Sequence, residues 1–512
     1  MAKRQNESER PEDNFRVVLD DVLTPGGVYA PPTSDYILIL IVHVQGRADP
    51  QRLALPFRDL DGANFEKLVP GCVYGCNRNR REVSQDIRQE LIGCLSYKRP
   101  SNQYPVRGGW NNLPAPTFWL GQEFIPAIDN DLLNVFTRTM GTPIHLVGGE
   151  LMEVDALKML ATVMLTHPDL RIPTFSFTVA SYLKSVWEQA ELPLRSTLFI
   201  YGKSGFGKSS LAHTFSALCN GEDGKPADAL SLESTVAATI NHCSKVRDRV
   251  VLLDDICRST DPQERRRCMA TAMQLLRYAS GELSVSKMKG NSDIQRKMEF
   301  GLVITSEILP QELSELTRCI VIHMTEEHSG GNEAEREMAA ACLRGYLAWF
   351  ANHYEQETAN IADQICELRP NPYPGYERLF KGIFQLAWCW DSFCRYAKDQ
   401  GVAMPQYDTC FRETMEHQID LIEGGTRKLI NVIATIYQQL KETNFHKGCV
   451  CVKLNELIFL VNGYMGRQDL RESDISVFLR AHRMVAMDAS ERVTKKIGGH
   501  RYIHLLPPQY WI

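Results

Sequence analysis

The chain has 512 residues, enough for about two to four domains of ordinary size. Hydrophobic residues make up 44% of it and charged residues 23%, a globular composition that excludes a chain disordered throughout. The formal net charge of −5 excludes a uniformly basic nucleic-acid binder, so any nucleic-acid contact must come from local basic patches.

The fifteen cysteines show no repeated metal-ligand spacing. Cys72 and Cys76 are followed by no second pair of His or Cys, and Cys449 and Cys451 alternate as in a strand. We therefore expect buried free thiols in a reducing cytoplasm rather than zinc. The first residues show no signal-peptide pattern, and the longest apolar run, "YILILIVHV", is too short to span a bilayer. A cytoplasmic protein without a membrane partner is predicted.

The N-terminal part of the chain predicts a disordered tail and an accessory domain. Residues 1–15 are polar. Residues 16–150 contain short β-rich stretches ("FRVVLDDV", "YILILIVHVQ", "PTFWLG") between Gly and Pro clusters, and one helical segment, "REVSQDIRQELIGCL". This pattern indicates an α+β accessory domain, whose role the sequence hardly reveals.

Residues 151–330 alternate apolar strands with amphipathic helices, which predicts a three-layer α/β domain with a parallel sheet. Early in this segment the apolar run "LFIY" breaks into "GKSGFGKS", residues 202–209, which we call the glycine loop. Its two outer glycines, lysine and hydroxyl stand at the spacing of a phosphate-binding loop. The predicted ligands are ATP and Mg²⁺.

Each residue type in the glycine loop has a physical role in such a site. Glycines let several backbone N–H groups approach one anion. Lys208 adds a positive charge for the β- and γ-phosphates, and Ser209 opens the next helix with a hydroxyl for Mg²⁺. The predicted nucleotide-binding residues are Gly202, Lys203, Ser204, Gly205, Phe206, Gly207, Lys208, Ser209 and Ser210.

Two carboxylates follow the apolar run of "RDRVVLLDDI". This arrangement predicts acids at the carboxyl edge of a buried strand, beside the glycine loop. Asp254 would hold Mg²⁺ through water, and Asp255 would orient and polarise the attacking water. The alternative is a helix N-cap after a strand, since Asp caps helices well.

Two further strands predict the rest of the catalytic apparatus. The strand "FGLVITSE" ends in Thr305, Ser306 and Glu307, and the two hydroxyls are expected to contact the γ-phosphate or its attacking water as a sensor. Arg318 stands at the entrance of the strand in "ELTRCIVIHM". The alternative for Arg318 is an ion pair with a local carboxylate.

This order of motifs resembles the ATPase core of superfamily-3 helicases, which are related to AAA+ proteins. The chain resembles more closely the bacterial family called domain of unknown function 927, ATPases found beside primases and on mobile elements. The shared features are "RGGW", "FIYGKSGFGKSSLA", "LLDDI", "ITSE" and an arginine before the last core strand. The resemblance implies an AAA+-like P-loop fold and a homo-oligomeric ring, a hexamer, in which Arg318 acts on the neighbouring subunit's nucleotide. Superfamily-3 proteins usually have Asn where this chain has Glu307.

The segment "LSVSKMKGNSDIQRKMEF" alternates as a strand, turns at Gly-Asn and returns. It is similar to the hairpin that projects into the ring's channel in these helicases, which implies contact with single-stranded DNA. Cations near a loop tip would meet phosphates without reading sequence. The alternative is a solvated surface hairpin. The cations are Lys287, Lys289, Arg296 and Lys297.

The C-terminal part of the chain predicts a helical region over residues 331–442 and a winged helix over residues 443–512. In the latter, the helices "VKLNELIFLVNGYMG" and "SDISVFLRAHRM" precede two strands around a Gly-Gly turn in "ERVTKKIGGHRYIHLL". Such modules bind duplex DNA, and they also dock proteins. The predicted DNA contacts are Arg480, Arg483, Lys495, Lys496 and Arg501, with His482 beside them.

Together these patterns predict an ATP-hydrolysing ring motor, a DNA helicase or translocase of a phage or mobile element, with a primase or another replication or defence protein as a partner. The alternative is an ATP-driven oligomeric switch or scaffold, for example in antiviral defence, that binds a partner protein without unwinding DNA. Both retain the ATPase, and they differ in what the hairpin and the C-terminal module bind.

Overall fold

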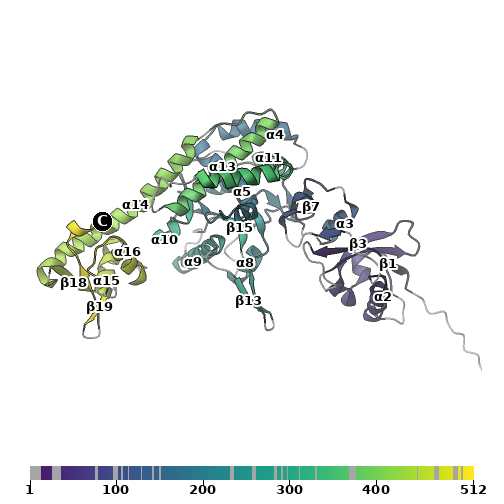
Figure 1. Cartoon of the computed structure of the whole chain (residues 1–512), viewed down its shortest axis with the longest axis horizontal. Helices are drawn as coiled ribbons and strands as arrows, with labels where there is room; N and C mark the ends of the chain where they lie inside the picture. The colour runs from purple at the N-terminus through teal and green to yellow at the C-terminus, as the bar shows by residue number, and fades with distance from the viewer. Residues whose placement is uncertain are drawn as a thin grey trace, which may run out of the picture. The chain divides into compact units, whose positions relative to one another are not determined.

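A computed structural model gives the fold of the chain (Figure 1). The chain forms two compact units, Met1–Met415 and Glu416–Ile512, and each is described by itself. The divisions predicted at 150 and 330 both fall inside the first unit, and most of the predicted tail lies outside the described residues. The structure describes residues 13–25, 36–74, 79–95, 102–104, 108–112, 115–128, 130–140, 143–148, 151–230, 236–256, 261–281, 285–289, 292–296, 298–310, 312–328, 331–367, 376–406, 408–446, 448–465, 472–487, 494–497 and 500–511.

The first unit begins with a four-stranded sheet in the order β3-β2-β1-β4. Successive side chains of a strand point to opposite faces. In β2, Leu38, Leu40 and Val42 pack into one apolar cluster, whereas Ile37 and Ile39 pack into another. Burial on both faces explains the uninterrupted apolar run in the sequence. The strands are β1 (Phe15–Pro25), β2 (Ile37–Val44), β3 (Gln51–Pro56) and β4 (Asn102–Tyr104).

Helices cover both faces of this sheet. One face packs on η1, α1 and α2, and the helix predicted in "REVSQDIRQELIGCL" is α2. The other face packs on α3 and on β7, which belongs to a three-stranded antiparallel sheet in the order β5-β6-β7. These elements are η1 (Phe57–Gly62), α1 (Phe65–Leu68), α2 (Arg80–Leu95), α3 (Asp131–Met140), β5 (Gly109–Asn112), β6 (Pro116–Leu120) and β7 (Glu123–Ile125).

A five-stranded sheet in the order β11-β12-β15-β9-β16 lies at the centre of the first unit, and every neighbouring pair in it is parallel. The predicted parallel sheet is therefore confirmed. Because β9, β12, β15 and β16 are largely buried on both faces, they contain near-continuous apolar runs. The strands are β9 (Thr197–Gly202), β11 (Ala229–Leu230), β12 (Arg247–Leu253), β15 (Glu299–Ser306) and β16 (Cys319–Met324).

Helices pack around the central sheet, and one of them, α5, is buried along nearly its whole length and contacts β12, β15 and β16. A helix that is buried on all sides carries no amphipathic stripe. A short β8–β10 pair lies beside these helices. The elements are α4 (Glu153–Met164), α5 (Pro168–Tyr182), α6 (Lys184–Gln189), α7 (Lys208–Phe215), α8 (Val236–Cys243), α9 (Pro262–Ala279), α10 (Leu313–Leu316), β8 (His145–Leu146) and β10 (Cys219–Asn220).

The helical region predicted after residue 330 consists of four long helices. Among them, α11 packs on α4 and α7, and α13 packs on α5 and β16. The last of the four, α14, continues from the first unit into the second. The helices are α11 (Glu333–Asn352), α12 (Tyr354–Glu367), α13 (Glu377–Asp399) and α14 (Asp408–Asn444).

The second unit has a four-stranded antiparallel sheet in the order β17-β18-β20-β19, with two helices between β18 and β19. The predicted order of helix, helix and hairpin is present. The first helix begins at Leu454 rather than at residue 452, because Val452 and Lys453 belong to β18. The elements are β17 (Phe445–His446), β18 (Cys449–Lys453), α15 (Leu454–Met465), α16 (Glu472–Ala481), β19 (Thr494–Ile497), β20 (His500–Leu505) and η2 (Pro508–Tyr510).

The cysteines that the structure describes are free thiols, and most of them are buried. Burial raises the pKa of the Cys219 thiol to about 11 and that of the Cys243 thiol to about 12. These thiols are protonated at neutral pH. Among the described helices, none combines the length and the apolarity that crossing a bilayer requires.

Candidate active site at the carboxyl edge of the central sheet

The glycine loop connects the end of β9 to the start of α7. Gly205 and Gly207 have positive φ values of +81° and +85°, a conformation that suits glycine. A Cβ at Gly207 would lie 2.7 Å from the carbonyl oxygen of His328, and one at Gly202 would lie 2.6 Å from the carbonyl oxygen of Met324. Gly202 is therefore required by close packing, Gly205 by backbone conformation and Gly207 by both.

Local hydrogen bonds hold the glycine loop in place. Lys208 is the first residue of α7, and its buried ammonium donates to the Lys203 carbonyl at 2.8 Å. The His328 N–H donates to the Phe206 carbonyl at 3.1 Å. Burial and the nearby cation Arg171 lower the pKa of His328 to about 4, so its ring is uncharged at neutral pH. A positive helix N-terminus and a buried lysine together favour an anion at this loop.

Asp254 follows the last residue of β12, next to the end of β15 in the parallel sheet. The Thr305 hydroxyl donates to Asp254 Oδ1 at 2.7 Å. The other carboxylate oxygen, Oδ2, lies 3.4 Å from Nε2 of His213, a residue of α7. The carboxylate is therefore contacted by side chains from both the neighbouring strand and the helix of the glycine loop.

The surroundings of Asp254 suit a hard cation. Burial acts to raise its pKa, but hydrogen bonding to His213, Thr305 and Ser209 lowers the pKa to about 2. The group is thus ionised at neutral pH. Mg²⁺ prefers carboxylate and hydroxyl oxygens, and Asp254 and Ser209 bring one of each together. These two residues fit the ion that the sequence predicts.

Asp255 adopts a left-handed backbone conformation, with φ of +50°. Its N–H donates to the Thr305 hydroxyl oxygen at 2.7 Å, so one hydroxyl accepts from Asp255 and donates to Asp254. Positive φ at a residue other than glycine is unfavourable and is found most often where neighbouring contacts enforce it. Thr305 thereby fixes the turn that carries both acids.

The end of β15 uses its two hydroxyls differently. Thr305 and Ser306 are both fully buried. The Ser306 hydroxyl donates to the Ile308 carbonyl at 2.8 Å and accepts from the Ile308 N–H at 3.0 Å, which closes a local turn. Glu307 is exposed. The Thr305 hydroxyl thus contacts the two acids, whereas the Ser306 hydroxyl contacts the backbone of Ile308. The sensor role stays a prediction for both residues.

We expect Thr305→Val to lower ATP hydrolysis by about ten- to a hundredfold, the loss typical of a residue that orients a metal-site carboxylate. Valine keeps the shape but removes the hydroxyl that joins Asp254 and Asp255. The measurement is steady-state phosphate release beside nucleotide affinity, which should change little. Thr305→Ser is the matched control and should retain most activity. A normal rate in the valine variant would contradict this role.

Arg318 lies between α10 and β16 and is partly buried. Its guanidinium donates to the Ser314 carbonyl, and its own carbonyl accepts from the Thr197 N–H at 2.8 Å. It also interacts electrostatically with Glu315. Arg318 therefore has local partners within its own subunit, and its action on a neighbouring subunit stays a prediction.

The basic hairpin predicted before β15 consists of β13 (Val285–Lys289) and β14 (Ser292–Arg296), paired antiparallel (Figure 1). Lys287 and Lys289 belong to β13, and Arg296 ends β14. The side chains of these three cations, the predicted turn and the whole of Lys297 lie outside the described residues. The hairpin is confirmed, and its DNA contacts stay a prediction.

The predicted DNA contacts of the second unit lie on α16 and on the final hairpin. Arg480 is in the last turn of α16, and Arg483 follows the helix with a φ of +51°. Arg501 pairs with Glu472 at 3.0 Å, an exposed ion pair of small energetic weight. Lys495 and Lys496 belong to β19, and their side chains lie outside the described residues.

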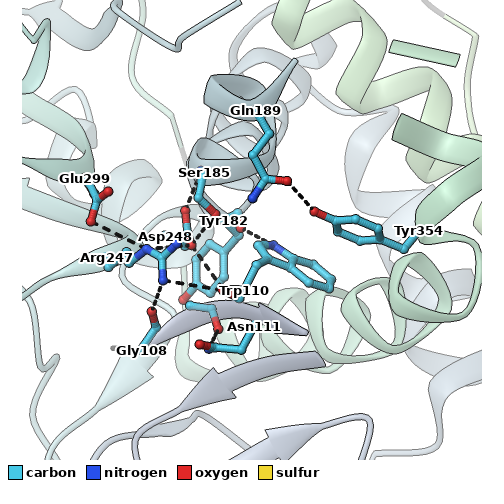
Figure 2. A network of polar contacts seen from close by, with 11 residues as sticks. Gly108, Trp110, Asn111, Tyr182, Ser185, Gln189, Arg247, Asp248, Glu299 and Tyr354 are labelled. Carbon is cyan, nitrogen blue, oxygen red and sulfur yellow. Dashed lines mark hydrogen bonds and ion pairs between the residues drawn. The ribbon is translucent and has the colours of Figure 1, made fainter. Parts of the chain in front are cut away.

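The Gly-Gly-Trp motif lies beside Arg247 and Asp248 (Figure 2), at the amino end of β12, whereas the acids follow its carboxyl end. The buried carboxylate of Asp248 accepts from the Trp110 N–H at 3.1 Å and from the N–H and hydroxyl of Ser185, both at 2.7 Å. The Trp110 indole donates to the Tyr182 carbonyl at 2.8 Å. A Cβ at Gly109 would lie 2.2 Å from Asp248 Oδ2. The motif therefore anchors β5 to the central domain.

Ionic contacts complete this anchor. Arg247 lies 3.7 Å from the carboxylate of Asp248 and 3.5 Å from that of Glu299 (Figure 2). Burial raises the pKa of Asp248 to about 6, although Arg247, Ser185 and Trp110 act to lower it. β5, which the division at 150 assigns to the accessory domain, thus contacts β12 of the sheet that carries the acids, and β6 and β7 pack on α11.

Sequence reasoning missed His213. It follows Ser209 by four residues in α7, so the two side chains lie on one face of the helix. That spacing is the only signal in the sequence, and it is weak without knowledge of which strand the helix faces. The structure places both side chains against Asp254.

Among the comparisons with known proteins, the one with solved structures finds a similarity, and it concerns the fold alone. No protein-family model matches the chain, and neither does any curated protein. The fold is similar to that of a solved structure described as SCCmec type IV Cch, an active helicase, with which the chain aligns at a TM-score of 0.61 and 13% identity, over 96% of this chain and 93% of that one.

Two further solved structures align much less well. The C-terminal region of NrS-1 gives a TM-score of 0.27 and 11% identity, over 94% of this chain and 96% of that one. The JCV helicase gives 0.21 and 11%, over 54% and 74%. These scores are too low to support an inference.

Proposed function

We propose that the protein is an ATP-hydrolysing motor that moves on nucleic acid. The observation that carries the proposal is the convergence on Asp254 of side chains from α7 and β15, directly beside the glycine loop. A phosphate-binding loop, an ionised acid at the neighbouring strand end and a hydroxyl between them are the parts that phosphoryl transfer from ATP requires. A three-layer AAA+-like arrangement is part of the proposal.

The roles of the residues follow from their positions. Lys208 and the loop N–H groups bind the β- and γ-phosphates, and Ser209 and Asp254 hold the metal ion. When bound, Mg²⁺ would neutralise the charge that develops on the phosphates. Asp255 orients the attacking water and accepts its proton. Thr305 keeps the two carboxylates in a fixed relation.

The nucleic-acid part of the proposal is supported by the fold and by the basic hairpin. The similar fold of SCCmec type IV Cch, described as an active helicase, favours a DNA helicase or translocase of a phage or mobile element. We propose a homo-oligomeric ring, a hexamer, with β13 and β14 reaching single-stranded DNA in its channel. The second unit, as a winged helix, would bind duplex DNA.

We expect the double change Lys287→Ala and Lys289→Ala to weaken binding of single-stranded DNA. The slope of the logarithm of the binding constant against the logarithm of the salt concentration should become shallower by about two, because each lysine that neutralises a phosphate contributes about one. Stimulation of ATP hydrolysis by DNA should disappear while basal hydrolysis persists. Fluorescence anisotropy at several salt concentrations and phosphate release measure these effects. The matched control is Lys67→Ala with Lys245→Ala, two lysines far from the hairpin in sequence. Unwinding that survives the hairpin double change would contradict the channel assignment.

A second function is favoured by one feature of the second unit. Phe459 on α15 and Val477 on α16 are 77% and 69% exposed, unusual values for such apolar side chains. An ATP-driven switch or scaffold that docks a partner protein would use such side chains. Wild-type ATP hydrolysis measured with and without single-stranded DNA separates the two: stimulation supports the motor, and its absence supports the scaffold.

A further inference from the structure

His213 lies at the acid that is proposed to hold the metal ion, and it belongs to the same helix as the serine that shares this role. Its Nε2 is 3.4 Å from Asp254 Oδ2, and the two side chains are 35% and 29% exposed. Because the contact is partly buried, it is screened less than a fully exposed surface pair. It is therefore able to orient the carboxylate.

The two oxygens of Asp254 have different partners. Oδ1 accepts from the Thr305 hydroxyl, and Oδ2 faces the His213 imidazole. A carboxylate held at one oxygen only remains able to rotate about its Cβ–Cγ bond, whereas one held at both has a fixed plane. Ser209 also hydrogen-bonds to this carboxylate, and removal of His213 would take away the imidazole that faces Oδ2.

We propose that His213 is a positioning residue that fixes the plane of the Asp254 carboxylate and so sets the affinity of the nucleotide site for Mg²⁺. This inference rests on the proposed function. His213 acts through Asp254 and not on the phosphates. Residues that contact a metal ligand without binding the metal typically contribute about ten- to a hundredfold in metal affinity.

His213 also lines a cavity. Its volume is about 540 Å³, and its lining includes His213, Gly221, Lys225, Pro226 and Ala229. This cavity is large enough to admit a small heterocycle. Free imidazole could therefore reach the space that the ring leaves when it is removed, which provides a route for rescue.

A matched histidine in the same domain serves as the control. His242 Nε2 lies 3.2 Å from Asp228 Oδ1, and that carboxylate also pairs with Arg249 at 3.0 Å. This pair is also a histidine–carboxylate contact, but it joins α8 to the residue before β11, whereas the His213 pair joins α7 to the residue after β12. His242→Ala therefore tests whether loss of any such pair has the same effect.

The experiment measures metal binding rather than turnover. Free Mn²⁺ is counted by its electron paramagnetic resonance signal in the presence of a non-hydrolysable ATP analogue, and Mg²⁺ affinity is obtained by competition. His213→Ala is expected to weaken both metals by about ten- to a hundredfold. Affinity for the analogue without metal should stay that of the wild type. His213→Gln, which keeps an N–H donor, should lose less, and imidazole should restore metal binding to His213→Ala only.

Each outcome decides the inference. Wild-type metal affinity in His213→Ala, or an equal loss in His242→Ala, would assign His213 a packing role and overturn it. If His213→Ala fails to fold, the test uses His213→Gln instead. A metal affinity of His213→Gln close to that of the wild type supports the donor role of His213. A full tenfold loss of metal affinity in folded His213→Gln overturns that role. Absence of metal-dependent nucleotide binding in the wild type would overturn the proposed nucleotide site itself, and the role of His213 with it.

Discussion

Lys208→Ala is expected to abolish measurable ATP hydrolysis. The rate should fall by a factor on the order of 10² to 10³, the loss that is typical when one preorganised donor to a reacting group is removed. Lys208 is buried at the first position of α7, and its ammonium reaches back to the carbonyl of Lys203 inside the glycine loop. A cation held there meets the phosphates without further movement of the backbone. Phosphate release at saturating ATP measures the loss.

The control for this prediction is Lys245→Ala. Lys245 is an exposed lysine between α8 and β12, at the opposite end of β12 from the acids. Its removal changes the net charge by the same amount as the Lys208 change, and hydrolysis should stay normal. Turnover in Lys208→Ala equal to that of the wild type would remove the ATPase proposal, whatever the nucleic-acid experiments show.

The glycine loop and the acids were predictable because their information is local. Eight consecutive residues specify both the positive φ values of Gly205 and Gly207 and the chemistry of Lys208 and Ser209. The acids follow directly after a buried strand, and the carboxyl ends of parallel strands meet at one edge. The order of strands in the sheet was not needed for this inference.

The contacts that organise the site were not predictable, because they join residues far apart in the chain. Thr305 reaches Asp254 across 51 positions, and Trp110 reaches Asp248 across 138. A sequence pattern indicates that Thr305 ends a strand, but it does not tell whether its hydroxyl meets a phosphate or an acid. Register between neighbouring strands decides this, and one sequence contains no direct record of register.

Arg318→Ala is expected to leave ATP binding nearly normal and to lower hydrolysis by a factor on the order of 10³ to 10⁵, if the arginine completes a neighbour's site. Phosphoryl transfer develops charge on the γ-phosphate oxygens, and an arginine from outside the binding subunit stabilises that charge. Within its own subunit the Arg318 guanidinium donates to the backbone carbonyl of Ser314 in the preceding turn. If the guanidinium leaves the Ser314 carbonyl to contact a phosphate, the loss of free energy is small, since water can replace the guanidinium at the carbonyl.

Mixing two inactive variants tests whether the site is shared. Arg318→Ala subunits keep both acids, and Asp255→Asn subunits keep the arginine. In a mixed ring, an Arg318→Ala site that receives its arginine from an Asp255→Asn neighbour is complete, so activity should return in mixtures and be absent from either protein alone. The control is a chain with both changes, which supplies no arginine and should rescue nothing. If subunits exchange and the mixtures stay inactive, or if Arg318→Ala hydrolyses ATP normally, Arg318 is a local structural residue and the ring loses its shared site.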